Sequence, residues 1–294
     1  MPEGRVVQCV GGFQTVLTPE AKTIVCTARG RIKKSQGEIV TGDLVLYENG
    51  PEAAVIEAVL PRRNILRRPV VANVDQAVLV FALRDPMPND LLIDRFLVSI
   101  MAAGLPVLLC FNKADLVGAK EAEALAGRYR EIGFRVVLTS TVARKGRHKL
   151  LAELYGLTTV FCGPSGVGKS ALLNMVKPGL TLTTGEVSAK IKRGRHTTRT
   201  ARLIPIGRQG YVVDTPGYTQ VDLAGVDSQR LLGCFPELAS RTGACRFDGC
   251  LHLAEPGCSV KEAVARGVLP PERYEHYRLF MAEIAENTDR SRHR

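Results

Sequence analysis

The sequence has no apolar run long enough to cross a membrane, because it contains no window of about 18 consecutive apolar residues. The amino-terminal stretch MPEGRVVQCVGG also lacks the charged-then-apolar order of a secretory signal peptide. We therefore expect a cytoplasmic protein without a membrane partner. Cysteines stay reduced in that compartment, so we expect the eight cysteines not to form disulfides.

The sequence has fewer acidic than basic residues. The 294 residues include 29 Asp and Glu against 40 Lys and Arg, which gives a formal net charge of +11. Such an excess favours a polyanionic partner, either nucleic acid or an anionic membrane surface, and a plain solubility charge is the alternative. Internal repeats and low-complexity segments are also absent. The hydrophobic content of 45% is typical of a soluble globular protein, and the length leaves room for two or three domains.

Residues 1–65 contain short β-type segments separated by glycine-containing turns. The segments are Arg5–Val10, Thr23–Ala28, Asp43–Tyr47 and Ala53–Leu60. Several short strands in so small a region predict a β-barrel. The OB-fold is the natural candidate because it has five strands and commonly binds oligonucleotides. An SH3-like barrel would give a similar pattern. A basic stretch, residues 61–68, follows as a connector.

Residues 74–222 alternate between strand and helix patterns. Val74–Leu83 and Val107–Phe111 are apolar runs of buried-strand length, and Asp90–Ala103 between them has helical periodicity. This rhythm predicts a mostly parallel sheet with helices on both faces, whose ligand-binding loops lie at the carboxyl ends of the strands. From about residue 223 the pattern becomes helical and includes Cys and His. We predict a barrel domain (1–68), an α/β domain (69–222) and a helical domain (223–294).

The strongest local motif is a phosphate-binding loop. Its pattern, G-x-x-x-x-G-K-S, lies between a predicted strand, Thr158–Cys162, and a predicted helix, Lys169–Val176. The glycines let backbone N–H groups turn toward phosphate, Lys169 brings a positive charge to the β and γ oxygens, and the Ser170 hydroxyl is a Mg²⁺ ligand. We predict that the nucleotide phosphates contact Gly163, Pro164, Ser165, Gly166, Val167, Gly168, Lys169, Ser170 and Ala171.

A base-reading motif, Asn112, Lys113, Ala114 and Asp115, comes earlier in the chain and follows another predicted strand. Guanine presents two adjacent donors, N1–H and the N2 amine, and the Asp115 carboxylate can accept both. Adenine offers no such pair, which disfavours ATP by about 1–3 kcal/mol or more. The Lys113 stem can pack on the base plane. A capped helix start, with Asp115 as the N-cap, is the plain structural alternative.

The stretch Thr139–Thr141 closes the next predicted strand. It is placed to support the base through backbone N–H groups, although ordinary strand-to-loop chemistry explains it equally well.

A third motif, DTPG at 214–217, follows an apolar strand. Asp214 can hold Mg²⁺ through water, and the Gly217 N–H can meet a γ-phosphate. The basic stretch upstream, KIKRGRHTTRT, offers Thr197 and Thr198 as switch threonines for Mg²⁺. We assign the role to Thr198 while the choice between the two stays open.

The residue after this motif is Tyr218, where Ras-like enzymes have a water-positioning Gln. A phenol cannot position water in the same way, so we predict slow intrinsic hydrolysis. His196 is the best local candidate for the missing group, and a plain surface histidine is the alternative. We predict His196, Lys169 and Thr198 as the catalytic residues.

A metal-ligand pattern lies near the carboxyl end, with the spacing Cys245-x4-Cys250-x-His252-x5-Cys258. Three thiolates and one imidazole suit a tetrahedral Zn²⁺, and four protein ligands leave no open position, so we predict a structural site. Cys234 could replace one ligand, although its surroundings indicate helix packing. Four unrelated loop residues are the alternative. The following Ser259–Glu262 has the pattern of a capping box, and the polar residues 287–294 are expected to fray.

The motifs stand in an unusual order. An ordinary GTPase has the P-loop first, then DxxG, then NKxD, whereas here NKxD precedes both. With the barrel and the Cys/His cluster, the chain resembles the RsgA (YjeQ) family of circularly permuted small-ribosomal-subunit biogenesis GTPases. The resemblance covers roughly residues 1–285 and rests on NKAD, GPSGVGKS, GRHTTR, DTPG and the Cys/His spacing.

The resemblance has specific implications. It implies an enzyme that binds GTP and GDP with Mg²⁺, carries one Zn²⁺, and acts late in maturation of the 30S subunit. It also implies contact of the barrel and the zinc domain with 16S rRNA, turnover stimulated by the ribosome, and a role for His196 in place of Gln. We further expect a monomer.

Two other functions compete with this interpretation. A non-hydrolysing RNA-binding module is supported by the missing Gln, but the intact Lys169, Ser170 and Asp214 favour hydrolysis. A P-loop ATPase or kinase is disfavoured by Asp115. The permuted order also suggests a hypothesis, in which a γ-phosphate-driven shift at 214–217 moves the C-terminal domain that follows it directly.

Overall fold

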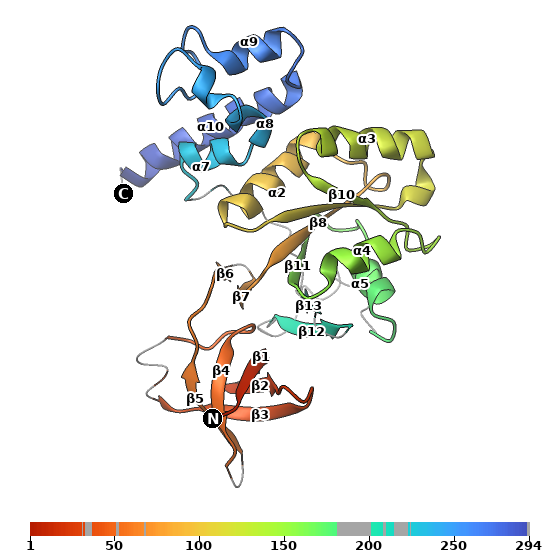
Figure 1. Cartoon of the computed structure of the whole chain (residues 1–294), viewed down its shortest axis with the longest axis vertical. Coiled ribbons are helices and arrows are strands. Elements are labelled where there is room, and N and C mark those ends of the chain that lie inside the picture. Colours follow the sequence, from red (N-terminus) through yellow and green to blue (C-terminus); the bar gives the residue numbers. More distant parts are fainter. Residues whose placement is uncertain are drawn as a thin grey trace. The chain divides into compact units, whose positions relative to one another are not determined.

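The structure, a computed structural model, describes residues 1–30, 32, 37–50, 53–67, 69–180, 201–207, 210–214, 223 and 225–292. The chain divides into two compact units, and the elements of both are labelled in Figure 1. The first consists of Met1–Val80 and Thr141–Thr219, and the second of Phe81–Ser140 and Gln220–Arg294. Among the described helices, none has the length and apolar character that crossing a membrane requires.

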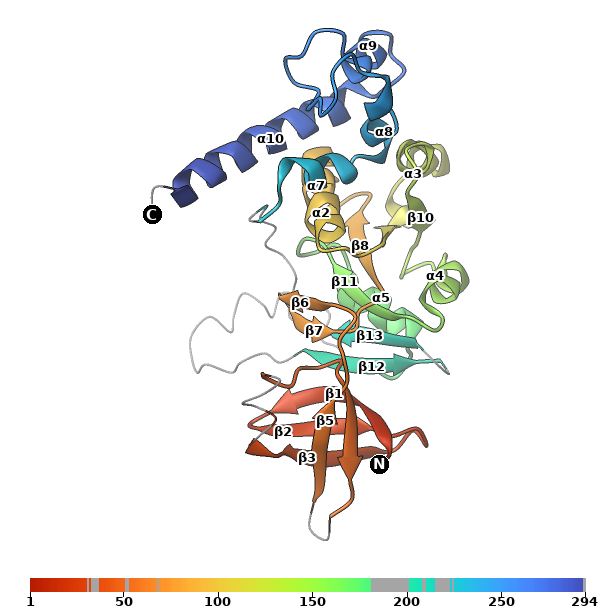
Figure 2. The same ribbon diagram turned by 60° about the vertical axis from the view of Figure 1, so that its left-hand side comes forward.

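The amino-terminal part of the first unit is a closed five-stranded barrel (Figure 2). Strand β1 pairs with β2 and with β4, β2 pairs with β3, and β4 pairs with β5, all antiparallel, while β3 and β5 are parallel. This ring is the topology of an OB-fold, so that prediction is confirmed over the SH3-like alternative. The five strands are β1 (Glu3–Val10), β2 (Phe13–Leu17), β3 (Thr23–Ala28), β4 (Leu44–Glu48) and β5 (Ala54–Val59).

The barrel has its own apolar core, because alternate residues of each strand face its interior. Val6, Val16, Val45 and Ile56 are completely buried there. Cys26 is also buried and has no disulfide partner, as expected for a small core residue.

The stretch predicted as a plain connector contains a β-hairpin instead. Strands β6 (Ile65–Arg67) and β7 (Val70–Ala72) pair antiparallel. Just before them, Arg62 donates from Nε to the fully buried Asp43 carboxylate at 2.7 Å. The basic residue is therefore a structural partner of the barrel, which the charge pattern alone did not reveal.

The first unit also contains the α/β layer that carries the phosphate-binding motif. Its β11 is parallel to β8 and to β13, while β12 is antiparallel to β13. The sheet continues into the barrel, because β1 pairs with β12 at Gln8 and Arg202. Thr41 also donates from Oγ1 to the Ala201 carbonyl at 2.9 Å. The elements are β8 (Gln76–Ala82), β11 (Thr158–Cys162), β12 (Arg202–Ile206), β13 (Gly210–Asp214), α4 (Arg147–Leu154) and α5 (Lys169–Val176).

The second unit contains the α/β layer that carries the base-reading motif. Strand β9 (Val107–Asn112) is buried throughout and parallel to β10 (Arg135–Leu138). Helix α2 (Asp90–Ala102) begins where the Asn89 side chain accepts from the Leu92 N–H at 2.9 Å. A second helix, α3 (Ala119–Glu131), follows a 3₁₀ turn, η1 (Ala114–Leu116).

The carboxyl-terminal part of the second unit is helical. Phe235 packs on the rings of Tyr277 and Phe280, with centroid distances of 5.4 and 6.3 Å. Val98 of α2 belongs to the same core, so these helices pack on the α/β layer of their own unit. The elements are α7 (Ser228–Gly233), α8 (Pro236–Ala239), η2 (Thr242–Ala244), α9 (Ser259–Ala265) and α10 (Pro271–Arg292).

Two local predictions for this region have different outcomes. Helix α10 continues to Arg292, and fraying of its polar end stays a prediction. The expected capping box is absent, because α9 has Cys258 at its N-cap position without a side-chain cap. The Ser259 hydroxyl instead donates to the Arg241 carbonyl at 2.8 Å. The hydroxyl therefore donates to a distant carbonyl instead of capping its own helix as an acceptor.

A buried ionic network joins α2 to α8 and α10. The completely buried Asp94 accepts from Arg273, and its other oxygen lies 2.6 Å from His276 Nδ1. Arg273 also donates from Nε to Glu237 at 2.7 Å, and its guanidinium lies 4.4 Å from the centroid of the Phe235 ring. Burial lowers the pKa of Arg273, but Asp94 and Glu237 outweigh burial and raise it above its ordinary value. The guanidinium is therefore a permanent charge between two carboxylates.

Candidate nucleotide-binding motifs and metal centre

The phosphate-binding motif forms a loop between β11 and α5 in the first unit. Gly163 and Gly168 have φ angles of +133° and +94°, a region that favours glycine. A Cβ on Gly163 would overlap the carbonyl oxygen of Val80 on the neighbouring strand, so a side chain does not fit there. The loop therefore passes close against the sheet and leads its N–H groups to the start of α5.

The Lys169 ammonium lies inside this loop. Its Nζ donates to the carbonyl oxygens of Gly163 at 2.8 Å and of Pro164 at 2.5 Å. Burial lowers the pKa of Lys169, and the neighbouring Cys162 offsets part of this effect. A phosphate oxygen offers the ammonium a charged acceptor, which forms a stronger hydrogen bond than a carbonyl does. Ser170, half-buried in the first turn of α5, is the hydroxyl available to a bound Mg²⁺.

The base-reading motif begins where β9 ends. The buried Asn112 accepts through Oδ1 from the Thr139 hydroxyl at 3.1 Å, and the Ala114 N–H donates to the Thr139 carbonyl at 3.0 Å. Lys113 adopts a left-handed φ of +59°, and its Nζ donates to the Asp85 carbonyl. These contacts fix the turn on which the base-reading carboxylate stands.

Asp115 itself is exposed at η1 and accepts a hydrogen bond from the Ser140 hydroxyl. It caps no helix, because η1 has Lys113 at its N-cap without a side-chain bond and α3 starts beyond it at Ala119. The capped-helix alternative is therefore wrong. The carboxylate is held from one side and open on the other, which suits the paired donors of guanine.

The stretch Thr139–Thr141 contacts the base-reading motif through two side chains. Support of the base through backbone N–H groups stays a prediction. The Thr139 hydroxyl orients Asn112, and the Ser140 hydroxyl orients Asp115. In the sequence, the hydroxyl residues directly after the strand are the signal that indicates these side-chain contacts.

The third motif is described only at its first residue. The backbone of Asp214 ends β13 opposite Arg202. The remaining predicted residues of this part of the site lie outside the described residues: His196, Thr197, Thr198, Gly217 and Tyr218. Their assigned roles stay predictions.

The four predicted metal ligands converge in the second unit. The Sγ atoms of Cys245, Cys250 and Cys258 and a ring nitrogen of His252 all lie within 4.8 Å of one another. His252 Nδ1 lies 3.3 Å from Cys258 Sγ and 3.6 Å from Cys245 Sγ. Thiolates around a tetrahedral Zn²⁺ are roughly 3.8 Å apart, so the set fits a four-coordinate ion. Burial lowers the pKa of His252, which favours the neutral imidazole that a metal ligand requires.

Neighbouring groups hold this cluster in place. The Glu255 carboxylate accepts from the N–H groups of Leu251 and Leu253 at 2.7 and 2.8 Å. From α10, the Tyr274 and Tyr277 hydroxyls donate to the carbonyls of His252 and Leu251 at 2.7 and 2.9 Å. The metal loop is therefore tied to α10 by its backbone. It has few apolar residues of its own to keep it folded.

Cys234 lies away from the cluster. It donates instead to the carbonyl of Arg230 at 3.1 Å, within the helical core. The alternative in which Cys234 replaces one ligand is not supported.

Two family models match this chain. Residues 59–224 match the family model of the RsgA GTPase, and residues 3–55 match that of the RsgA N-terminal domain. The chain belongs to the RsgA GTPase family. A small ribosomal subunit biogenesis GTPase RsgA from Moorella thermoacetica is 44% identical over 283 residues, covering 96% of this chain and 97% of the relative. Its counterpart from Carboxydothermus hydrogenoformans is 45% identical over 287 residues, covering 97% and 98%.

Solved structures of the RsgA family share the whole fold. YjeQ from Thermotoga maritima matches with a TM-score of 0.83 at 34% identity, covering 97% of this chain and 98% of that one. YloQ, described as a circularly permuted GTPase, matches with a TM-score of 0.82 at 36% identity, covering 97% and 96%. The predicted permuted GTPase fold and the assignment as a GTP hydrolase are thereby confirmed. The Cys/His cluster of this RsgA family member can hold a metal ion.

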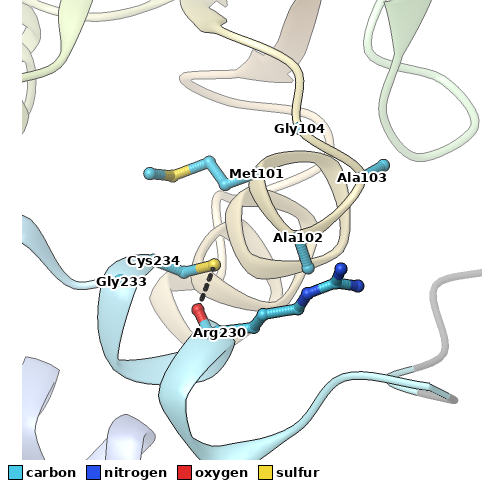
Figure 3. A pocket seen from close by; sticks show the side chains of 7 residues that line it. All are labelled: Met101, Ala102, Ala103, Gly104, Arg230, Gly233 and Cys234. Carbon is cyan, nitrogen blue, oxygen red and sulfur yellow. Dashed lines mark hydrogen bonds between the residues drawn. The ribbon is translucent and has the colours of Figure 1, made fainter. Parts of the chain in front are cut away.

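Two hollows of the second unit lie apart from these motifs. The larger, of about 550 Å³, is lined by the end of α2 and by α7, with Met101, Arg230 and Cys234 around it (Figure 3). The smaller, of about 100 Å³, adjoins the Asp94 and Arg273 network. Neither is lined by a residue of the nucleotide motifs or by a predicted metal ligand.

Proposed function

We propose that this protein acts on the small ribosomal subunit late in its maturation and uses GTP hydrolysis to time its release. The full-length match to proteins named small ribosomal subunit biogenesis GTPase RsgA is the observation that carries this proposal. The intact P-loop and base-reading motif, with Lys169 and Asp115 in the environments described above, support it. Intrinsic hydrolysis is slow in this proposal, and the ribosomal particle accelerates it.

The motifs divide the recognition of GTP between them in this proposal. Asp115 accepts from the guanine edge and Asn112 supports it, while residues 163–171 hold the phosphates. Ser170 and Thr198 hold Mg²⁺, which supplies charge neutralisation at the phosphates, and Asp214 and Gly217 take part at the γ-phosphate. His196 positions the attacking water. It takes the role of the Gln that Ras-like enzymes have where this chain has Tyr218.

The remaining parts of the proposal concern metal, partners and location. The ion in the Cys245, Cys250, His252 and Cys258 cluster is Zn²⁺, because three thiolates and an imidazole suit that metal, and its role is structural. The barrel and the zinc-binding domain contact 16S rRNA, which agrees with the net charge of +11. The protein works in the cytoplasm as a monomer.

The decisive experiment measures phosphate release from GTP with no particle and with purified 30S, 50S and 70S particles. We expect a strong acceleration with 30S particles and a slow rate without them. An equal rate in all four conditions would contradict the proposal. Omitting protein, and replacing GTP by ATP, control for contaminating hydrolases. A titration of fluorescent GDP against fluorescent ADP tests the guanine preference separately.

A further inference from the structure

A basic surface of the first unit belongs to neither the nucleotide motifs nor the metal site. We call it the basic loop, residues 142–149, which spans the turn before α4 and the first turn of that helix. Arg144, Lys145, His148 and Lys149 are all at least partly exposed there. The chain has no Asp or Glu from residue 132 to residue 152, so no acidic neighbour in sequence dilutes the charge.

The cations of the basic loop differ from most other exposed arginines of the described chain in having no carboxylate partner. Among the described residues, Arg144, Lys145 and Lys149 take part in no ion pair and no hydrogen bond through their side chains. Many exposed arginines elsewhere in the described chain are paired with acids, although Arg202 and Arg246 are not: Arg29 with Glu57, Arg63 with Asp75, Arg84 with Glu121, Arg128 with Asp90, Arg130 with Glu123, Arg266 with Glu262 and Arg278 with Glu275.

Contacts within the folded chain do not explain the positive charges of the basic loop. The first turn of α4 has no acidic residue, and its N-cap is Gly146 without a side-chain bond. Cations in the first turn face the positive end of the helix dipole, which is unfavourable. Among the arginine and lysine side chains of the basic loop, that of Arg147 makes a hydrogen bond to described residues, from Nε to the Met175 carbonyl at 2.8 Å. The remaining explanations are a charged partner outside the chain and a plain solubility charge.

We propose that the basic loop binds the phosphate backbone of RNA in the ribosomal particle. This proposal rests on the proposed function and adds a contact on the GTPase region itself, beyond the barrel and the metal-binding domain. Unpaired Lys and Arg side chains are the groups that neutralise nucleic-acid phosphates. An anionic membrane would favour an apolar face beside the charges, but the loop exposes only one large apolar side chain, Val142. The surface therefore fits RNA better than lipid.

The test removes the three unpaired cations in a triple variant, R144A/K145A/K149A. Its matched control, K120A/R128A/R130A, removes the same number of positive charges from the exposed face of α3. Affinity for 30S particles is measured at several salt concentrations. We expect the loop variant to bind more weakly than wild type, with a salt slope shallower by about 1 for each phosphate that the variant no longer neutralises. The control should keep the wild-type slope, and both variants should keep the intrinsic rate of GTP hydrolysis.

The outcomes separate this proposal from the function on which it rests. Wild-type affinity and slope in the loop variant, with normal 30S stimulation of the wild-type protein, would overturn the basic-loop proposal alone. Absence of 30S binding by the wild-type protein would count against the proposed function. In that case, binding to a protein-free RNA duplex and to vesicles containing an anionic lipid still tests the loop. Loss of vesicle binding with unchanged RNA binding would assign the loop to lipid and contradict the proposal.

Discussion

Replacing Arg273 by leucine tests the buried ionic network of the second unit. The change leaves Asp94, which is completely buried, and Glu237, whose side chain is 5% exposed, without their shared cation. It also removes the guanidinium from the Phe235 ring. Breaking a buried ion pair by removing one partner costs about 3–5 kcal/mol, because an uncompensated charge remains. We expect a loss of that size in the stability of the packing between α2, α8 and α10.

Native-state hydrogen exchange is the assay, because it reports local opening of each helix. The amides of α8 and α10 should exchange faster in the Arg273→Leu variant, while those of the barrel should keep their protection. Arg278→Leu is the matched control on the same helix, since Arg278 is 51% exposed and pairs only with Glu275. An exposed pair of this kind contributes roughly 0–1 kcal/mol.

A third variant separates charge burial from packing. Combining Arg273→Leu with Asp94→Leu and Glu237→Leu removes all three charges, and such replacements are often neutral or stabilising. We therefore expect the triple variant to recover much of the lost protection. The reasoning is refuted if Arg273→Leu costs no more than Arg278→Leu, or if the triple variant is less protected than the single one.

Three further predictions concern the sites. Ser140→Ala should weaken binding of GTP and GDP by about 1 kcal/mol, roughly five-fold, because Asp115 loses its orienting hydroxyl. Fluorescent-nucleotide titration measures this affinity, and an unchanged value would contradict the role of Ser140. Lys169→Ala should lower the rate of GTP hydrolysis by at least about 100-fold, whereas Lys177→Ala, which removes only a bond to the Pro205 carbonyl, should keep the rate; equal rates would contradict the phosphate role. The Cys258→Ser variant should lose bound zinc and the hydrogen-exchange protection of α9, while the Cys234→Ser variant should keep its zinc. Metal analysis and hydrogen exchange check both variants. Zinc retained without Cys258 would refute the ligand assignment.

The parts of the fold that the sequence predicts are those with a local cause. Strands β8, β9 and β11 are mostly apolar, which is typical of strands that are buried along their whole length, as these are. Strand β2 was missed because its alternation is short and begins with the exposed Phe13. Strand β12 was missed because it contains Pro205, which lacks the N–H that a strand pattern leads one to expect.

The same distinction holds for the candidate sites. The positions of the P-loop and NKAD motifs follow from the spacing of their residues. Phosphates and a base edge contact residues that are neighbours in the sequence, and these contacts impose the spacing. The hydroxyl of Ser140 on Asp115 links residues that are distant in sequence, and so does the contact of Arg273 with Asp94. Only tertiary packing brings such pairs together, so a single sequence carries no periodicity that predicts them.

The junction between β1 and β12 has a consequence for the edge of the nucleotide-binding layer. A terminal strand of an open sheet presents free N–H and C=O groups that recruit other chains. Here the amino-terminal barrel meets that margin at one residue pair, Gln8 and Arg202, while the other side of β12 is hydrogen-bonded to β13 along the strand. A fragment that begins after the barrel would expose this margin to its own copies. In the whole chain the barrel thus occupies part of an edge that such a fragment would leave open.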